Sequence, residues 1–130
     1  MPTGSRLEGV RVVWIPAEDR SVAAQQRILA TDVECADSIL SQARGLMFRR
    51  SIPPEYALAF RFGDVKTRDV HMVFVPFAID AVWVADDVVT RVERLRPWRG
   101  FAREDADLIV ELPAGAADDV AAGDRLWLDD

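Results

Sequence analysis

A period of two in the apolar residues is the feature that most constrains the fold of this chain. Tyr56, Leu58, Phe60 and Phe62 alternate with alanine or arginine. Such alternation is typical of a β-strand with one buried face. Further short apolar segments follow at regular spacing to the end of the chain, with no helix-length segment between them. Strands that follow one another directly disfavour a parallel sheet, so the sequence predicts a mainly β domain.

The order of the predicted elements adds a single helix to this β-rich chain. A helix is expected over residues 38–44, where Ser38 is the N-cap, Gly45 is the C-cap and the apolar residues have helical spacing. We therefore expect a mainly β (α+β) fold: an antiparallel β-sandwich or a partly open barrel, with the short helix packed on it. The predicted strands are residues 10–15, 27–36, 56–62, 70–75, 78–84, 88–95, 108–112 and 125–128. The predicted connections are turns at Gly63-Asp64 and Asp86-Asp87, a loop over residues 97–103 and one helical turn over residues 116–122.

Length and composition indicate one globular domain. Half of the 130 residues are apolar, 29% are charged and the mean hydropathy is +0.01, which excludes intrinsic disorder and a membrane-spanning class. We treat residues 1–130 as a single domain, with residues 1–29 as an N-terminal extension that carries one strand. One cysteine and one histidine cannot form an internal disulfide or a Cys/His zinc site. Phosphate-loop and dinucleotide motifs are also missing, so we expect no cofactor, and no metal site is identified. Whether Asp80 and Glu111 bind a divalent metal does not follow from the sequence.

The charge balance is acidic. Sixteen basic residues stand against 22 acidic ones, and the net charge of −6 argues against non-specific nucleic-acid binding. Arginines around Trp98 are typical of single-strand binding, but acidic residues lie among them and favour a solvated face with local ion pairs. Lys66 is the sole lysine and aspartate outnumbers glutamate fifteen to seven. This composition resembles that of proteins from salt-loving archaea, although a GC-rich genome would also favour arginine. The arginine cluster comprises Arg91, Arg94, Arg96, Arg99 and Arg103.

No targeting segment is visible in the sequence. The first residues lack the basic and apolar regions of a signal peptide. The longest largely apolar stretch, residues 72–84, is too short to span a bilayer and contains Asp80. We therefore expect a cytoplasmic protein that contacts neither nucleic acid nor a membrane.

The standard catalytic signatures are missing. The chain has no Gly-x-Ser-x-Gly elbow and no His-Glu-x-x-His helix, and a serine or cysteine triad would have to use His71 as its only imidazole. Motifs therefore identify no catalytic residue, and the sequence leaves open whether the protein is an enzyme.

Four motifs in order resemble the domain-of-unknown-function 192 family. Residues 44–50 resemble its Gly-Leu-Met-x-Arg signature, and His71-Met72 followed by Asp80 resembles its Trp-Met-x(7)-Leu-Asp stretch. Residues 111–115 and Gly123-Asp124 match its Glu-Leu-x-x-Gly and Gly-Asp elements. The resemblance extends from about residue 30 to the C-terminus, and departs from the family at His71, where tryptophan is usual. It implies a fold similar to β-sandwich proteins and no established activity.

Asp80 and Glu111 are the polar residues that most need an explanation. Alternation places Asp80 on a face with Val82, and Glu111 on a face with Ile109. A buried carboxylate is costly unless it is paired, so we expect Asp80 to be buried, ionised and bound to a cation. Arg49 is the first choice as partner, His71 the second, and Arg91 is also available. A shared polar pocket and a sheet edge that faces water explain the two carboxylates equally well. The candidate polar site comprises Arg49, His71, Asp80 and Glu111.

Two functions of different class remain open. The favoured hypothesis is a small β-domain that binds a small ligand or a protein partner and has no established activity. The alternative is a hydrolase- or lyase-type enzyme that uses Asp80 and Glu111 as acid and base, assisted by His71 or Arg49. The identity of the ligand and the oligomeric state do not follow from the sequence.

Overall fold

The computed structural model describes residues 5–18, 26–36 and 45–130, and this part of the chain is mainly β. It contains no helix, and the helix predicted over residues 38–44 lies outside the described residues. Accordingly, the described residues include no helix long and apolar enough to cross a membrane. The strands are β1 (Ser5–Arg6), β2 (Arg11–Ile15), β3 (Arg27–Ala30), β4 (Asp32–Cys35), β5 (Tyr56–His71), β6 (Ile79–Ala85), β7 (Val88–Leu95), β8 (Phe101–Pro113) and β9 (Arg125–Asp129).

The nine strands of the described residues belong to one open sheet with the order β1-β4-β5-β8-β6-β7-β9-β2-β3. The prediction of mainly β structure is confirmed, but the hydrogen bonding forms one continuous sheet that does not close. The expected all-antiparallel pairing fails at one place, since β4 and β5 are parallel. Residues 36–55 connect these two strands, which is long enough for the crossover that a parallel pair needs.

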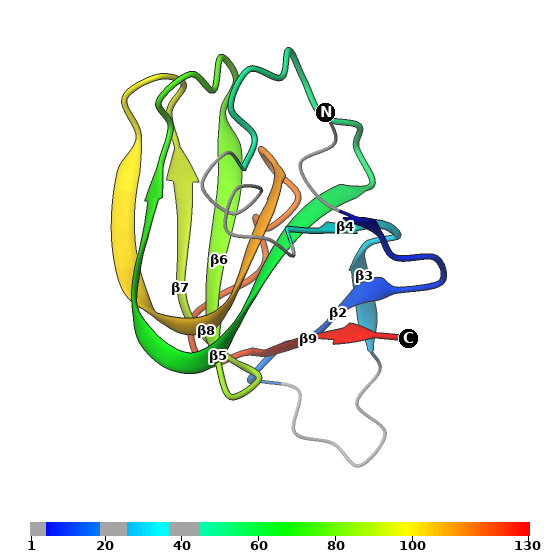
Figure 1. The fold of residues 1–130 in the computed structure, drawn as a ribbon. Helices are drawn as coiled ribbons and strands as arrows, with labels where there is room; N and C mark the ends of the chain where they lie inside the picture. The colour runs from blue at the N-terminus through cyan, green and yellow to red at the C-terminus, as the bar shows by residue number, and fades with distance from the viewer. Residues whose placement is uncertain (1–4, 19–25, 37–44) are drawn as a thin grey trace.

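Strands β5 and β8 are long and bend back over the sheet. Figure 1 shows both strands turning at the lower end of the molecule, where the pairing of β5 with β8 shifts register between Arg61 and Lys66. The turn predicted at Gly63-Asp64 is therefore wrong: the strand continues through an irregularity of the kind that lets a sheet curve. The strand predicted to begin at Val70 is instead the end of β5, which finishes at His71. Strand β8 begins at Phe101, within the loop predicted over residues 97–103.

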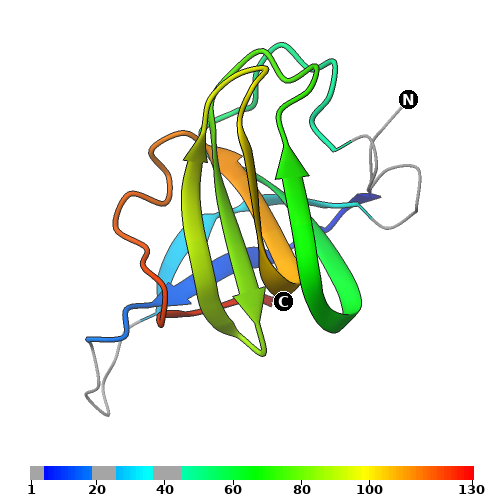
Figure 2. The same cartoon turned by 90° about the vertical axis from the view of Figure 1, so that its left-hand side faces the viewer.

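Two apolar clusters fill the two faces of the central strands. The first cluster is packed between β2 and β9 on one side and β5, β8 and β6 on the other. Figure 2 shows β2, β3 and β9 crossing behind β5, β8 and β6. The other lies inside the bend of β5 and β8. Alternation along β6 assigns Val82 and Val84 to the first cluster, and Ala81 and Trp83 to the second. Strand β6 is therefore buried on both faces, which explains its almost continuous apolar sequence.

The tight connections differ in how well the sequence predicted them. Asp86 and Asp87 form the predicted hairpin turn between β6 and β7, with φ angles of 51° and 65°. Two residues with positive φ are what a two-residue hairpin turn requires, and aspartate tolerates that conformation. Residues 116–122 were predicted to make one helical turn, but residues 114–119 form successive turns without a helix.

Candidate functional site

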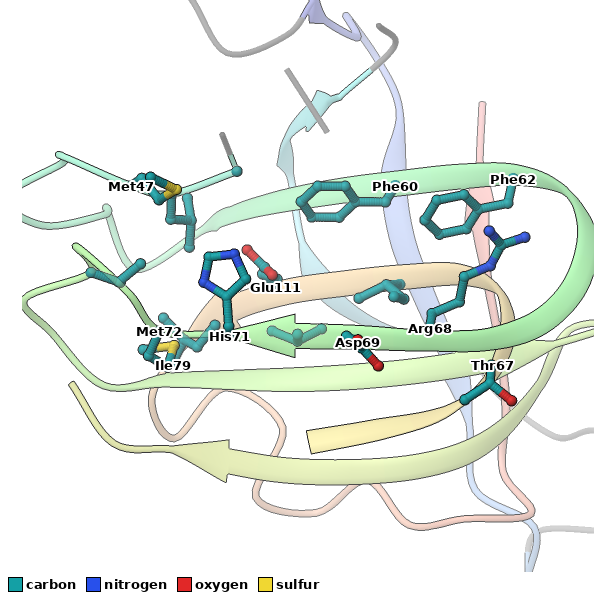
Figure 3. A pocket seen from close by; sticks show the side chains of 15 residues that line it. Met47, Phe60, Phe62, Thr67, Arg68, Asp69, His71, Met72, Ile79 and Glu111 are labelled. Carbon is teal, nitrogen blue, oxygen red and sulfur yellow. The ribbon is translucent and has the colours of Figure 1, made fainter. Parts of the chain in front are cut away.

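A pocket of about 420 Å³ lies inside the bend of β5 and β8. Both arms of β5 line it, because the bend brings residues 67–71 over Phe60 and Phe62. Nine of its fifteen lining residues have apolar side chains, and Thr67, Arg68, Asp69, His71 and Glu111 supply polar ones. The segment after Gly45 closes one side. Figure 3 shows Met47, His71, Met72 and Glu111 at one end of the pocket, and Phe62, Arg68 and Thr67 at the other. The principal apolar lining residues are Leu46, Phe60, Val70, Met72, Ile79 and Ile109.

Glu111 is the buried polar group of this pocket. Its side chain is on the same face of β8 as Ile109, as alternation predicted, and the residue is only 7% exposed. No hydrogen bond joins its carboxyl group to another residue in the described ranges. Burial raises the pKa of Glu111 to about 8, while the positive charge of Arg49 acts in the opposite direction. This shift favours the neutral carboxylic acid at pH 7, the form that can donate one hydrogen bond and accept others.

Gly45 sits directly against this carboxyl group. Its φ of +51° is in the left-handed region, and a Cβ atom at this position would lie 3.9 Å from Glu111 Oε1 and 3.5 Å from the Phe60 ring. Glycine adopts that conformation without the steric cost that other residues meet. The Gly-Leu-Met motif thus places Leu46 and Met47 in the wall of the pocket, beside Glu111.

His71 lies at the same end of the pocket as Glu111 (Figure 3). Its Nδ1 accepts a hydrogen bond of 3.2 Å from the backbone N–H of Val73. In the neutral ring this leaves the proton on Nε2, so His71 can offer a second hydrogen-bond donor. The pocket therefore combines an apolar interior with Glu111 and His71 at one end and with Thr67 and Arg68 at the other.

Arg49 is next to the pocket but is held by two other residues. Its guanidinium donates to Tyr56 Oη at 2.9 Å and to Glu34 Oε1 at 3.3 Å, and Tyr56 Oη donates to the same glutamate oxygen at 2.8 Å. Burial, together with the hydrogen bond to Glu34, raises the pKa of Tyr56 above its usual range. Arg49 thus forms an ion pair with Glu34 and not with Asp80. Its partners, Glu34 and Tyr56, were not identified from the sequence.

Asp80 is buried and ionically paired as predicted, but its partner is Arg94. Arg94 Nε lies 2.8 Å from Asp80 Oδ1, so the choice of Arg49 or His71 was wrong. Asp80 Oδ2 also accepts from the backbone N–H groups of Gly115 and Ala117, both at 2.9 Å. Asp80 on β6 lies opposite Arg94 on β7, so this ion pair could be identified only once the register of the two strands was known.

Asp80 and Glu111 lie on opposite faces of the sheet. Glu111 is paired with Ala81 and Asp80 with Leu112, so the two carboxyl groups point away from each other. The acid–base pair of the alternative hypothesis is therefore not formed, and only Glu111 and His71 of the candidate polar site line the pocket. Asp80 instead fixes the loop after β8, where Asp124 acts similarly by accepting from Trp14 Nε1 and the N–H groups of Ala17 and Ala121.

The arginine cluster around Trp98 is partly neutralised by ion pairs. Arg91 pairs with Glu93, Arg94 with Asp80 and Asp118, and Arg103 with Asp69. This agrees with the interpretation of a solvated face with local ion pairs. For metals, the described part of the chain holds no group of three histidine, cysteine or carboxylate side chains.

The fold and the pocket define a class: a small open-sheet β-domain with a ligand-sized cavity inside a bent strand pair. The chain belongs to the DUF192 family, described as "Uncharacterized ACR", whose model matches residues 20–128. It is 32% identical over 102 residues to the UPF0127 protein PH1112 of Pyrococcus horikoshii, across 73% of this chain and 85% of that protein. No enzymatic activity is established for this family.

Two solved structures share the fold. A proposed transcription regulator of Sinorhizobium meliloti 1021 matches with a TM-score of 0.74 and 23% identity, over 95% of both chains. A protein of unknown function from Novosphingobium aromaticivorans DSM 12444 matches with a TM-score of 0.70 and 19% identity, over 90% of this chain and 83% of that one. At these identities the likeness concerns the fold alone.

Proposed function

We propose that this protein binds a small, mostly apolar molecule in the pocket, with the polar group of that molecule hydrogen-bonded to Glu111. One observation carries the proposal: a buried carboxyl group faces a pocket and has no hydrogen-bond partner among the described residues. Leaving such a group unpaired costs about 1–3 kcal/mol, and native proteins rarely do so without a reason. A bound ligand would supply the missing partner.

The pocket favours a neutral or acidic ligand over a cationic one. Its volume of about 420 Å³ falls within the range of small-molecule sites, and its walls suit an alkyl or aromatic body. A protonated Glu111 complements a group that both accepts and donates, such as a primary amide or a carboxylic acid. An ammonium group would require ionised Glu111, and the nearby charge of Arg49 opposes a second cation.

Thermal shifts with a matched ligand series test this proposal. Amides, acids, alcohols and amines with the same hexyl to decyl chains would be added to the wild-type protein and to variants at Glu111. Ligands that bind the native state raise the melting temperature by mass action. We expect the amides to raise the melting temperature of the wild type and of Glu111→Gln more than that of Glu111→Leu. Glutamine keeps a neutral donor and acceptor at this position, whereas leucine does not.

The control is Glu104→Gln, which changes a half-exposed glutamate on the same strand outside the pocket. This variant should respond to the ligands as the wild type does. The proposal fails if no member of the series stabilises the wild type, or if Glu111→Leu binds the amides as well as the wild type does.

A second candidate function is acid catalysis by Glu111. A carboxyl group with a pKa of about 8 is protonated at neutral pH and can act as a general acid, and His71 lies at the same end of the pocket. Asp80 has no part in this version of the enzyme hypothesis. Hydrolysis of p-nitrophenyl esters of the same chain lengths would support it if turnover disappears in Glu111→Gln while amide binding remains.

We further propose that the protein is adapted to a salt-rich cytoplasm and does not bind nucleic acid. The net charge of −6, the excess of aspartate and the presence of a single lysine support salt adaptation. The ion pairs of Arg91, Arg94 and Arg103 reduce the charge that the arginine cluster could offer to nucleic-acid phosphates.

A further inference from the structure

Exposed aromatic side chains meet at one end of the sheet. Phe48, Phe74 and Trp98 are 62%, 46% and 55% exposed, and Val73 beside them is also exposed. The rings of Phe48 and Phe74 stack with their centroids 5.0 Å apart, and Trp98 meets Phe74 edge-on at 6.4 Å. We call these four residues the aromatic loop patch. A contiguous exposed apolar surface of this kind marks an interaction site.

Three loops far apart in the sequence build this patch. Phe48 precedes β5, Phe74 lies between β5 and β6, and Trp98 lies between β7 and β8; Figures 1 and 2 both show these loops gathered at the upper end of the molecule. Backbone hydrogen bonds tie the loops together: Phe48 N–H donates to Phe74 O at 2.8 Å, and Trp98 N–H donates to Val75 O at 3.0 Å. The rings are thus held in place before any partner arrives.

The backbone of the patch is strained. Phe48, Phe74 and Trp98 have φ angles of 69°, 60° and 66°, a region that bulky residues rarely enter. Such conformations persist only where the surrounding structure enforces them, and they concentrate at functional sites. Glycine or asparagine would suit these positions better, so the aromatic side chains are not explained by the needs of the loops themselves.

The charge of these loops is opposite to that of the whole chain. Residues 45–55, 72–78 and 96–100 contain four arginines and a single acidic residue, Glu55, although the net charge of the protein is −6. Arg49 is paired with Glu34. Arg50, Arg96 and Arg99 are exposed, and none of them forms an ion pair with another residue in the described part of the chain. The patch therefore combines apolar rings with local positive charge.

A lipid surface matches this combination better than single-stranded nucleic acid does. Base stacking requires open ring faces, and the mutual stacking of Phe48 and Phe74 covers one face of each ring. Residues 72–78 are all apolar and provide no side-chain group that could read a base edge. Aromatic rings favour the boundary between lipid headgroups and acyl chains, and arginines near an anionic membrane are attracted to its phosphates.

We propose that the aromatic loop patch docks this protein onto an anionic lipid bilayer, with its rings at the headgroup boundary and Arg50, Arg96 and Arg99 against lipid phosphates. This proposal replaces the expectation, drawn from the sequence, that the protein contacts no membrane. It is independent of ligand binding, but the two surfaces adjoin. Met47 and Met72 line the pocket and directly precede Phe48 and Val73 of the patch. A docked protein would thus hold its pocket next to the bilayer.

Vesicle binding by the full chain tests the proposal. Cosedimentation with phosphatidylcholine vesicles, with and without phosphatidylglycerol, would be compared between the wild type and the single variants Phe48→Gly, Phe74→Gly and Trp98→Gly. Glycine suits the positive φ at all three positions, so these variants should melt at the wild-type temperature or above it. We expect wild-type binding that requires phosphatidylglycerol, and at least a tenfold loss in each glycine variant.

Two further measurements separate the aromatic and arginine contributions. Trp98 is far more exposed than Trp14 or Trp83, so vesicles should shift the tryptophan emission to the blue in the wild type and not in Trp98→Gly. Each of Arg50→Ala and Arg99→Ala should weaken binding about fivefold at low salt. Added salt should reduce the effect of the arginines and leave that of the rings.

Ile28→Ala and Arg61→Ala are matched controls, because these residues are an exposed apolar side chain and an exposed arginine outside the three loops. Both variants should bind vesicles as the wild type does. The proposal is overturned if the patch variants bind as well as the wild type. It is also overturned if the wild type does not bind vesicles. This includes the cases in which the wild type binds an oligothymidine instead, or forms a dimer that the patch variants do not form.

Discussion

Replacing Asp80 by alanine should destabilise the fold by about 2–4 kcal/mol, chiefly because two backbone amides lose their acceptor. Asp80 Oδ2 receives the N–H groups of Gly115 and Ala117, both at 2.9 Å. A buried donor left without an acceptor costs about 1–3 kcal/mol, and the amide of Gly115 is less buried than that of Ala117. The side chain of Arg94 is half exposed, so water can solvate it once Asp80 is gone.

Urea unfolding followed by tryptophan fluorescence measures this cost at fixed salt and pH. The denaturation midpoint should fall without a change of slope, since the surface exposed on unfolding stays the same. Asp119→Ala, an exposed aspartate in the same loop, is the control and should change stability by no more than about 0.5 kcal/mol. The reasoning is refuted if Asp80→Ala is equally mild. It is also refuted if Arg94→Ala costs as much as Asp80→Ala, because the ion pair would then dominate.

Two further predictions concern pH and salt. The pKa of Glu111 is raised from 4.5 to about 8, so over that interval the unfolded chain has lost a proton that the folded protein retains. The contribution of Glu111 to the free energy of unfolding should therefore fall as the pH rises from about 4.5 to 8, by up to about 1.4 kcal/mol per pH unit. Replacing the group in Glu111→Gln should remove this pH dependence in urea melts. If the variant and the wild type show the same pH profile, the carboxyl group is not buried in the neutral form. For salt, the melting temperature should be higher in molar potassium chloride than at low ionic strength, and an unchanged or lower value would contradict salt adaptation.

Periodicity was enough to predict the mainly β structure and the side of its strand on which a residue lies, but it missed the continuation of β5 through Gly63 to His71. Alternation correctly placed Asp80 with Val82 and Glu111 with Ile109, and the aspartate pair at residues 86–87 correctly predicted a hairpin turn. The apolar surroundings of Asp80 were enough to predict its burial and its need for a cation. These features depend on neighbours within a few positions, so they can be read from a single sequence.

The partners across strands were decided only by the tertiary structure. Arg94 faces Asp80 because of the register of β6 and β7, and the opposite orientation of Asp80 and Glu111 follows from the register of β6 and β8. The bend in β5, which creates the pocket, occurs at a Gly-Asp pair that looks like an ordinary turn in the sequence. A period of two fixes the face of a residue within its own strand. Which faces meet depends on contacts between distant segments, because the burial of the whole sheet, rather than any local preference, selects the register.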